Sequence, residues 1–311
     1  MSTDLPADVR TSSAQSFRRR GRKGGQRVVS WWLVIPGLVV AAGVHLLAPL
    51  AGGWYAFTDW TGVGSPTGVG FDNFREIFSS TGTRTALFNT LKLAGLFVVI
   101  VNILGLAMAL AVNRVLKTRN LLRSVFFLPV AMSSLAIAFI WQYIFQFEGP
   151  LNKFLGAIGL DSWQRAWLAD PGWSIWTVLI VLIWQYAGLA MVLYLAGLQT
   201  IPDELLEAAE VDGASALRRF RKIVFPLLAP ALTVSVTLML IQGLRVFDQV
   251  LALTGGGPAG ASETLSTLMW KETFVNGRFG YGAALALILT LIVGALSLTQ
   301  AAVLRRRERR I

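Results

Sequence analysis

The stretch "EAAEVDGASALRRFRKIVFP", from Glu207 to Pro226, is rich in charge although both of its flanks are apolar. The apolar segments on its two sides are Trp173–Leu198 and Leu227–Leu253. Each is long enough to supply the about 20 residues that a helix needs to cross a bilayer. A charged segment between two such blocks is typical of a loop that joins two membrane spans, and it therefore decides the class of fold.

Four further apolar segments have the same character, namely Trp31–Phe57, Ala86–Val112, Leu121–Phe145 and Tyr281–Leu304. Of the 311 residues, 54% are hydrophobic and 14% are charged, whereas soluble domains carry about 25% charged residues. The apolar runs are too long for the short alternating strands of a membrane β-barrel. The sequence therefore predicts an all-α polytopic membrane protein with six transmembrane helices.

The formal net charge is +11, and much of the basic charge lies in four clusters. These clusters are Arg10–Arg27, Arg114–Arg123, Arg218–Lys222 and Arg305–Arg310. Because cytoplasmic loops of membrane proteins carry an excess of Lys and Arg, the clusters place both termini in the cytoplasm. Membrane orientation thus accounts for the basic charge, and we expect no nucleic-acid partner.

The same patterns predict the domain organisation. Residues 1–30 are polar, rich in Ser and Arg and without apolar periodicity, which predicts a disordered basic cytoplasmic tail. Residues 31–304 form the transmembrane domain, with a cytoplasmic loop at 199–226, and residues 305–311 form a second basic tail. The string "LTGGGP", Leu253–Pro258, predicts a turn on the outer side, and no Lys-Ser/Thr follows it to make a phosphate-binding loop.

The charged loop has the signals of two short helices joined by a tight turn. Thr200 is a candidate N-cap, Pro202 suits a first helical turn, and the acids that follow complement the helix dipole. Gly213 predicts the end of the first helix in a left-handed conformation, which costs other residues about 1–2 kcal/mol. The second helix carries the basic cluster and passes near Pro226 into the next span.

Three acids of the first helix, Asp203, Glu207 and Glu210, are four and then three residues apart and so form a stripe on one face. A solvated connector whose charges only set the topology explains the arginines, but the positive-inside rule requires no acids. A docking surface for another protein explains both kinds of charge. We therefore predict that a second protein contacts this loop.

The loop resembles the signature of the permease subunits of ATP-binding-cassette importers. That signature reads EAA, three residues, Gly, nine residues, Ile, two residues, Pro, and its positions here are Glu207, Ala208, Ala209, Gly213, Ile223 and Pro226. One mild departure is Phe225, which stands where the family usually has Leu. The resemblance implies that these residues, together with Asp212, couple the permease to its ATPase, and that the helix ending at Gly213 is the coupling helix.

Shorter strings along the chain are similar to the carbohydrate branch of this family, the maltose- and glycerol-3-phosphate-type permeases. They are "NTLKLA" at Asn89, "GLAMAL" at Gly105, "RSVFFLP" at Arg123, "GPLN" at Gly149, "YLAGLQTIPDELLEAAEVDGA" at Tyr194 and "GGP" at Gly256. The resemblance implies the type I importer permease fold, in the lipid of a bacterial or archaeal plasma (inner) membrane. It also implies a heterodimer with a second permease, two copies of a P-loop ATPase, and an extracytoplasmic binding protein that delivers a small-molecule sugar.

The absence of an ATP-binding motif from the sequence constrains how transport is powered. No Gly-x4-Gly-Lys-Ser/Thr motif is present, so the chain itself does not bind ATP in a P-loop. We expect no cofactor on this chain, no enzymatic activity of its own, and ATP and Mg²⁺ on the partner ATPase. With one histidine and no cysteine, a His-rich metal site and disulfides are excluded.

Two alternatives from other classes stay open. A stand-alone ion-coupled secondary transporter usually keeps acids or histidines in its spans, and the spans here offer His45, Arg245 and Asp248. Arg245 and Asp248 are three residues apart, so they are able to pair on one helix face. A membrane receptor, in contrast, would recruit a partner through the same charged loop but transport no solute.

A sugar path needs hydrogen-bonding side chains and aromatic rings inside a mostly apolar cavity. The candidates in the predicted spans are Gln142, Trp184, Gln185, Tyr186, Gln242, Arg245 and Asp248. The strings "IWQYIF" and "IWQYAG" share a Trp-Gln-Tyr core, which forms either a pair of sugar platforms or ordinary helix packing. Packing is the more common role of such residues, and both interpretations stay open at this point.

Overall fold

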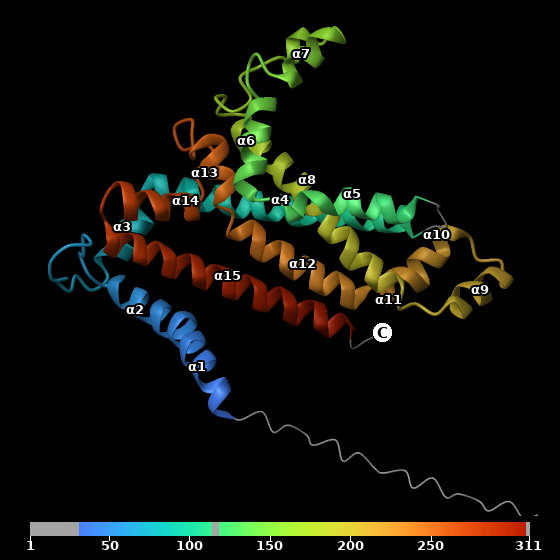
Figure 1. Ribbon diagram of the computed structural model, residues 1–311, viewed down its shortest axis with the longest axis horizontal. Helices are drawn as coiled ribbons and strands as arrows, with labels where there is room; N and C mark the ends of the chain where they lie inside the picture. The colour runs from blue at the N-terminus through green and yellow to red at the C-terminus, as the bar shows by residue number, and fades with distance from the viewer. Residues whose placement is uncertain (1–30, 114–117, 309–311) are drawn as a thin grey trace, which may run out of the picture. The chain divides into compact units, whose positions relative to one another are not determined.

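The computed structural model describes residues 31–113 and 118–308, and the chain in these ranges is largely helical (Figure 1). Within them no strand forms beyond one isolated bridge between Thr58 and Gly68, which confirms the all-α prediction. The α-helices are α1 (Trp31–Ala42), α2 (Ala48–Tyr55), α3 (Asp72–Ser79), α4 (Thr81–Val112), α5 (Arg119–Ala131), α6 (Ser134–Ile144), α7 (Pro150–Ala157), α8 (Ser174–Leu198), α9 (Asp203–Val211), α10 (Ala216–Arg219), α11 (Phe225–Leu227), α12 (Ala229–Leu244), α13 (Asp248–Thr254), α14 (Leu265–Trp270) and α15 (Phe279–Glu308). Single π-helical turns, η1 (Gly43–Leu47), η3 (Phe220–Val224) and η4 (Lys271–Val275), and one 3₁₀ turn, η2 (Asp161–Trp163), complete the helical elements.

The described residues fall into two compact units, with the boundary between Ala48 and Pro49. The first unit contains α1 and η1, and the second contains the bundle described below. The predicted tail at residues 1–30 lies outside the described residues, as do residues 114–117 and 309–311 of the basic clusters. Arg305 and Arg306, assigned from the sequence to the second tail, belong to α15.

Four helical segments are long and apolar enough to cross a membrane, namely Val34–Tyr55, Thr81–Val112, Ser174–Leu198 and Phe279–Arg306. Two further pairs of helices pass the same test together but are bent, by 97° between α5 and α6 and by 67° between the α10–α11 segment and α12. The described chain therefore has four such helices, or up to six spans if each bent pair is one span.

The predicted span Leu121–Phe145 is wrong as one continuous helix. Helix α5 ends at Ala131, and Met132 and Ser133 have extended backbones before α6 begins. Pro129 lies in the last turn of α5, where it has no N–H to donate to the preceding turn. The chain therefore bends sharply inside a segment whose composition is uniformly apolar.

The predicted span Leu227–Leu253 is also interrupted, because α12 ends at Leu244 and α13 begins at Asp248. The backbone between these helices is not helical, so the carbonyl of Val246 needs a partner from elsewhere. The hydroxyl of Thr264 donates to that oxygen at 3.3 Å. A contact with a later part of the chain thus stabilises the break, and nothing in the local sequence marks it.

Helix α8 is the centre of the bundle, where it packs against α4, α5 and α12 (Figure 1). Two glycines allow these close approaches. A Cβ atom at Gly188 would lie 1.8 Å from the carbonyl oxygen of Phe126 on α5, and one at Gly105 on α4 would lie 2.5 Å from the Cβ of Ala190. Small residues at such crossings are the usual way in which helices associate in lipid, where burial of apolar surface adds little.

A buried amide joins three of these helices. Asn102 on α4 accepts hydrogen bonds through Oδ1 from the hydroxyl of Tyr194 on α8, at 2.8 Å, and from that of Ser235 on α12, at 2.7 Å. Its Nδ2 donates to the carbonyl of Val98 at 2.7 Å. Because buried polar groups are costly unless they are satisfied, this arrangement fixes the register of α4, α8 and α12.

We expect Gly188→Ala to destabilise the bundle by about 1–3 kcal/mol, the usual cost of overpacking. The added methyl group would overlap the Phe126 carbonyl, and the backbone of α5 would have to move. Gly95→Ala on α4 is the matched control, because no atom lies within 4 Å of a Cβ at that position. The midpoint of thermal unfolding in mild detergent measures the difference, and equal midpoints for the two variants would contradict the close approach.

Candidate functional site

The charged loop at residues 199–226, called the coupling loop here after its predicted role, is anchored to the end of α8 by its apolar residues. Ile201 is buried, and Leu206 of α9 packs against the same cluster, which includes Tyr194 and Leu198 of α8. Helix α9 begins after Pro202, whose backbone is extended and whose position is the N-cap. The prediction that Thr200 caps this helix is wrong, because the Thr200 hydroxyl donates to the carbonyl of Gly197 at 2.8 Å.

The end of α9 follows the predicted pattern. Gly213 has φ +74°, in the left-handed region. The N–H of Ala214 donates to the carbonyl of Ala209 at 2.9 Å, and that of Gly213 donates to the carbonyl of Glu210 at 3.0 Å. These two bonds form a Schellman motif, which satisfies the last carbonyls of the helix and reverses the chain.

An ion pair joins the two arms of the coupling loop across this turn. Glu210 of α9 pairs with Arg219 of α10. All three acids of the predicted stripe are exposed, and Glu210 is the one for which the described residues show an ion pair within the loop. The loop is therefore a helix–turn–helix whose two arms are joined by an ion pair.

The motif residues separate into two groups by exposure. Glu207, Ala208, Asp212 and Gly213 are exposed, whereas Ala209, Ile223 and Pro226 are half-buried. Beside the exposed group lie three large apolar side chains, Leu205, Val211 and Leu217, which are 45%, 88% and 66% exposed. Exposed apolar side chains that gather on one loop are typical of a protein–protein contact.

A second candidate site lies where α12 gives way to α13. A hollow of about 110 Å³ is lined by Tyr186, Gln242, Arg245 and Asp248, four of the predicted sugar-path residues. Gln242 Nε2 donates to the Tyr186 hydroxyl at 3.1 Å. The predicted Arg245–Asp248 pairing on one helix face is wrong, because the helix ends between them and no ion pair joins these two described residues.

The other predicted sugar-path residues lie elsewhere. Gln185 is buried behind the hollow, where its Oε1 accepts from Gln249 Nε2 at 2.8 Å and its Nε2 donates to Ser134 at 3.3 Å. Trp184 packs edge-on against Trp141, with ring centroids 5.6 Å apart. Gln142 is half-buried on α6, apart from the residues that line the hollow.

Sequence reasoning missed two polar residues of this hollow, Ser134 and Gln249. Gln249 directly follows Asp248 in a predicted span, and a second polar residue at membrane depth is the signal that would have identified it. Ser134 has no such signal, because serine is common in membrane helices.

Chemically, the hollow offers hydrogen-bond donors and acceptors with one cation and one anion. Among the described residues no group of three or more His, Cys, Asp or Glu side chains is placed to hold a metal ion. The described hollow contains no histidine, cysteine or lysine to act as a nucleophile or base at neutral pH. Its groups suit the recognition of hydroxyl-bearing ligands.

Comparisons with known proteins identify the family of the chain. The probable starch degradation products transport system permease protein AmyD of Thermoanaerobacterium thermosulfurigenes is 34% identical over 278 residues, which cover 89% of this chain and 94% of that protein. The trehalose/maltose transport system permease protein MalF of Thermococcus litoralis is 32% identical over 268 residues, or 85% of this chain and 90% of that protein.

A solved structure gives the same result for the fold. A crystal structure of a bacterial ABC transporter involved in the import of the acidic polysaccharide alginate matches with a TM-score of 0.77 at 25% identity, covering 88% of this chain and 96% of that one. The model of the family described as binding-protein-dependent transport system inner membrane component matches residues 101–310. The chain is therefore a member of the family of inner membrane components of binding-protein-dependent transport systems.

Proposed function

We propose that this chain is a transmembrane permease subunit of an ATP-driven sugar importer. It forms half of the translocation pathway and receives the movement of a separate ATPase through the coupling loop. The sugar assignment is supported by the relatives, whose names refer to starch degradation products, trehalose and maltose. A neutral sugar panel for tests is therefore maltose, maltotriose and trehalose.

The observation that carries this proposal is the surface of α9. Exposed acids and exposed Leu205 and Val211 lie together on a short helix. That helix is fixed to α8 at one end and braced by the Glu210–Arg219 pair at the other. A surface of this kind favours a groove on a partner protein, and its stiffness allows it to transmit force.

The remaining partners follow from the same proposal. ATP and Mg²⁺ bind to two copies of the P-loop ATPase, since this chain has no P-loop. A second permease completes the pathway as a heterodimer, and an extracytoplasmic binding protein delivers the sugar. Both termini and the coupling loop lie in the cytoplasm, because the basic clusters occur there.

We further propose that the hollow beside Arg245 forms part of the sugar path. Tyr186, Gln242 and Asp248 bring donors and acceptors to a break between two helices, and broken helices are a common place for substrate groups in transporters. Gln185 has both ends of its amide occupied, so we assign it to packing. Trp184 also fits packing, since its ring contacts Trp141.

Membership of the family does not favour the stand-alone ion-coupled carrier. His45 bonds the carbonyl of Ala41 within its own helical turns, and Arg245 forms no ion pair with Asp248.

Reconstitution in proteoliposomes tests the proposal directly. The chain is combined with its second permease, its ATPase and its binding protein, and uptake of the sugar panel is measured with ATP, without ATP, and with an ion gradient alone. We expect uptake only with ATP and binding protein. Uptake driven by the ion gradient alone would establish the rival carrier.

We expect Gly213→Val to reduce ATP-driven uptake at least tenfold while the protein still inserts. A β-branched residue is strained at φ +74°, yet no atom lies within 4 Å of a Cβ there, so the bundle is not disturbed. Gly213→Asn is the matched control, because Asn tolerates the left-handed region. Uptake by the Val variant at the wild-type rate would refute a role for this turn in coupling.

We expect Glu207→Lys to weaken the association with the ATPase, since it reverses an exposed charge on the proposed docking surface. Glu148→Lys changes an exposed acid outside the coupling loop by the same charge and is the control. The yield of ATPase that co-purifies with each variant is the measurement. Full yield with the Glu207 variant would exclude that residue from docking.

A further inference from the structure

The loop between α13 and α14, residues 255–264, has an unusually constrained backbone. Four of its residues lie in the left-handed region, namely Gly255, Gly256, Ala259 and Gly260, with φ of 60°, 83°, 48° and 77°. Ala259 holds that conformation although it carries a Cβ, which costs energy that the surroundings must supply. The loop is therefore held in one shape by its contacts rather than by local preference.

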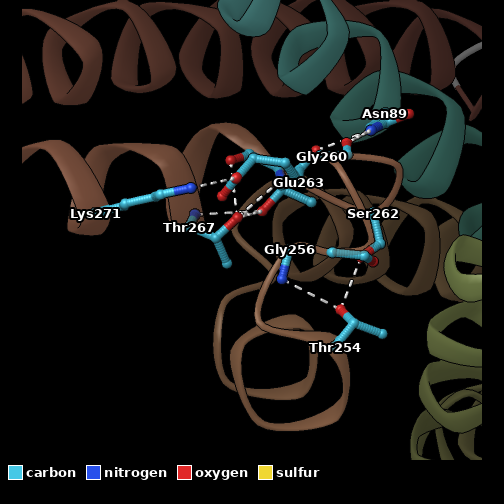
Figure 2. Close-up of polar contacts among 10 residues, drawn as sticks. Asn89, Thr254, Gly256, Gly260, Ser262, Glu263, Thr267 and Lys271 are labelled. Carbon is cyan, nitrogen blue, oxygen red and sulfur yellow. Dashed lines mark hydrogen bonds and ion pairs between the residues drawn. The ribbon is translucent and has the colours of Figure 1, made fainter. Parts of the chain in front are cut away.

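Those contacts come from the loop itself and from α4, as Figure 2 shows. Asn89 of α4 donates through Nδ2 to the carbonyls of Gly260, Ala261 and Glu263, at 3.2, 3.2 and 3.0 Å. The buried hydroxyl of Ser262 donates to the carbonyl of Gly257 at 2.7 Å. The loop thus forms a fixed wall beside the start of α4.

The carboxylate of Glu263 is held in an unusual position by this wall. Its side chain is only 10% exposed, and its nearest charged neighbour is Lys271 Nζ, at 3.6 Å from Oε2 (Figure 2). No hydrogen bond to the carboxylate oxygens forms among the described residues. A Cβ at Gly256 would lie 2.8 Å from Oε1, so the backbone of Gly256 passes close to the carboxylate.

A hollow of about 530 Å³ opens beside this carboxylate, within the size range of ligand sites, about 300–1,000 Å³. It is lined by the glycine backbone of the loop, by Thr81 and Thr85 at the start of α4, and by Glu263 and Lys271. A carboxylate has about four acceptor positions and an ammonium has three donors. Most of this hydrogen-bonding capacity is open to whatever occupies the hollow.

The charges at this hollow decide which ligand fits. Glu263 and Lys271 cancel each other, so the wall has no net charge with which to attract a phosphate or a basic side chain. One carboxylate beside an ammonium is also a poor cation site. A neutral ligand that carries both donors and acceptors at short spacing matches the pair, and vicinal hydroxyl groups have that property.

We propose that this hollow is a sugar-binding site separate from the one beside Arg245. Glu263 accepts hydrogen bonds from one hydroxyl of the sugar, and Lys271 donates to its neighbour. The assignment rests on the proposed function, because it takes the transported sugar as the ligand. Since the loop precedes the last span on the predicted outer side, the site would hold sugar before it enters the pathway.

The chain has no cysteine, so one introduced thiol reports on the hollow without background. Thr85→Cys places the thiol on the wall, and Ser162→Cys, in an exposed part of another loop, is the control. The maleimide labelling rate is measured in the assembled transporter in nanodiscs, without binding protein, against rising maltose, maltotriose or trehalose. We expect at least one sugar to slow labelling several-fold at Thr85→Cys and to leave Ser162→Cys unchanged.

Second substitutions, added to the Thr85→Cys variant, identify the side chains that bind the sugar. Glu263→Gln keeps the side-chain shape and Lys271→Met keeps the length, and each should raise the sugar concentration for half-protection about tenfold, as expected for a lost charge-assisted bond. Glu148→Gln and Lys153→Met, both at exposed positions, are the matched controls and should change nothing.

Several outcomes would overturn the proposal. One is labelling that no sugar of the panel slows, and another is full protection in the Glu263→Gln variant. If the Glu263→Gln variant bound the binding protein more weakly while protection by sugar was unchanged, Glu263 would be a docking residue for the binding protein instead. ATP-driven uptake without protection would refute this site and leave the importer assignment intact, whereas absence of uptake would refute the importer assignment independently of the labelling.

Discussion

The close packing of α8 against its neighbours is the constraint on which the bundle depends. Gly188 lets the backbone of α5 come near, and Gly105 does the same for α4. In a bilayer, lipid tails compete equally for apolar side chains, so helices associate through shape and through satisfied polar contacts. The hydrogen bonds of Asn102 to Tyr194 and Ser235 then select one register among those that shape alone would allow.

The coupling loop is packed against this central part of the bundle. The cluster that buries Tyr194 and Leu198 of α8 also includes Ile201 and Leu206, so the start of the loop is packed onto the core. A Schellman turn at Gly213 and the Glu210–Arg219 pair then connect α9 to α10. A movement of α9 would therefore act on α8 through this cluster, as the proposed coupling role requires.

Polar groups gather where the helices are broken. Between α12 and α13 the backbone leaves the helix, and Arg245 and Asp248 line a hollow there. The loop 255–264 is a second irregular segment, fixed by Asn89 and presenting Glu263. Irregular backbone in a membrane protein is tolerated where protein buries it or where it lines a cavity, so both segments occur where a solute path would need donors and acceptors.

The sequence by itself determined the fold class, the positions of the long helices α4, α8 and α15, the left-handed turn at Gly213 and the family, because composition, spacing and a specific motif are local properties. Prediction from the sequence failed where contacts between distant parts of the chain determine the structure. Nothing local predicted that Thr264 would stabilise a break at Val246. Pro129 is a local signal for the end of a helix, but it does not predict the bend of 97° between the two segments. Only the folded chain places Glu263 beside Lys271 and brings Tyr186 to Gln242, since those pairs depend on which helix faces meet.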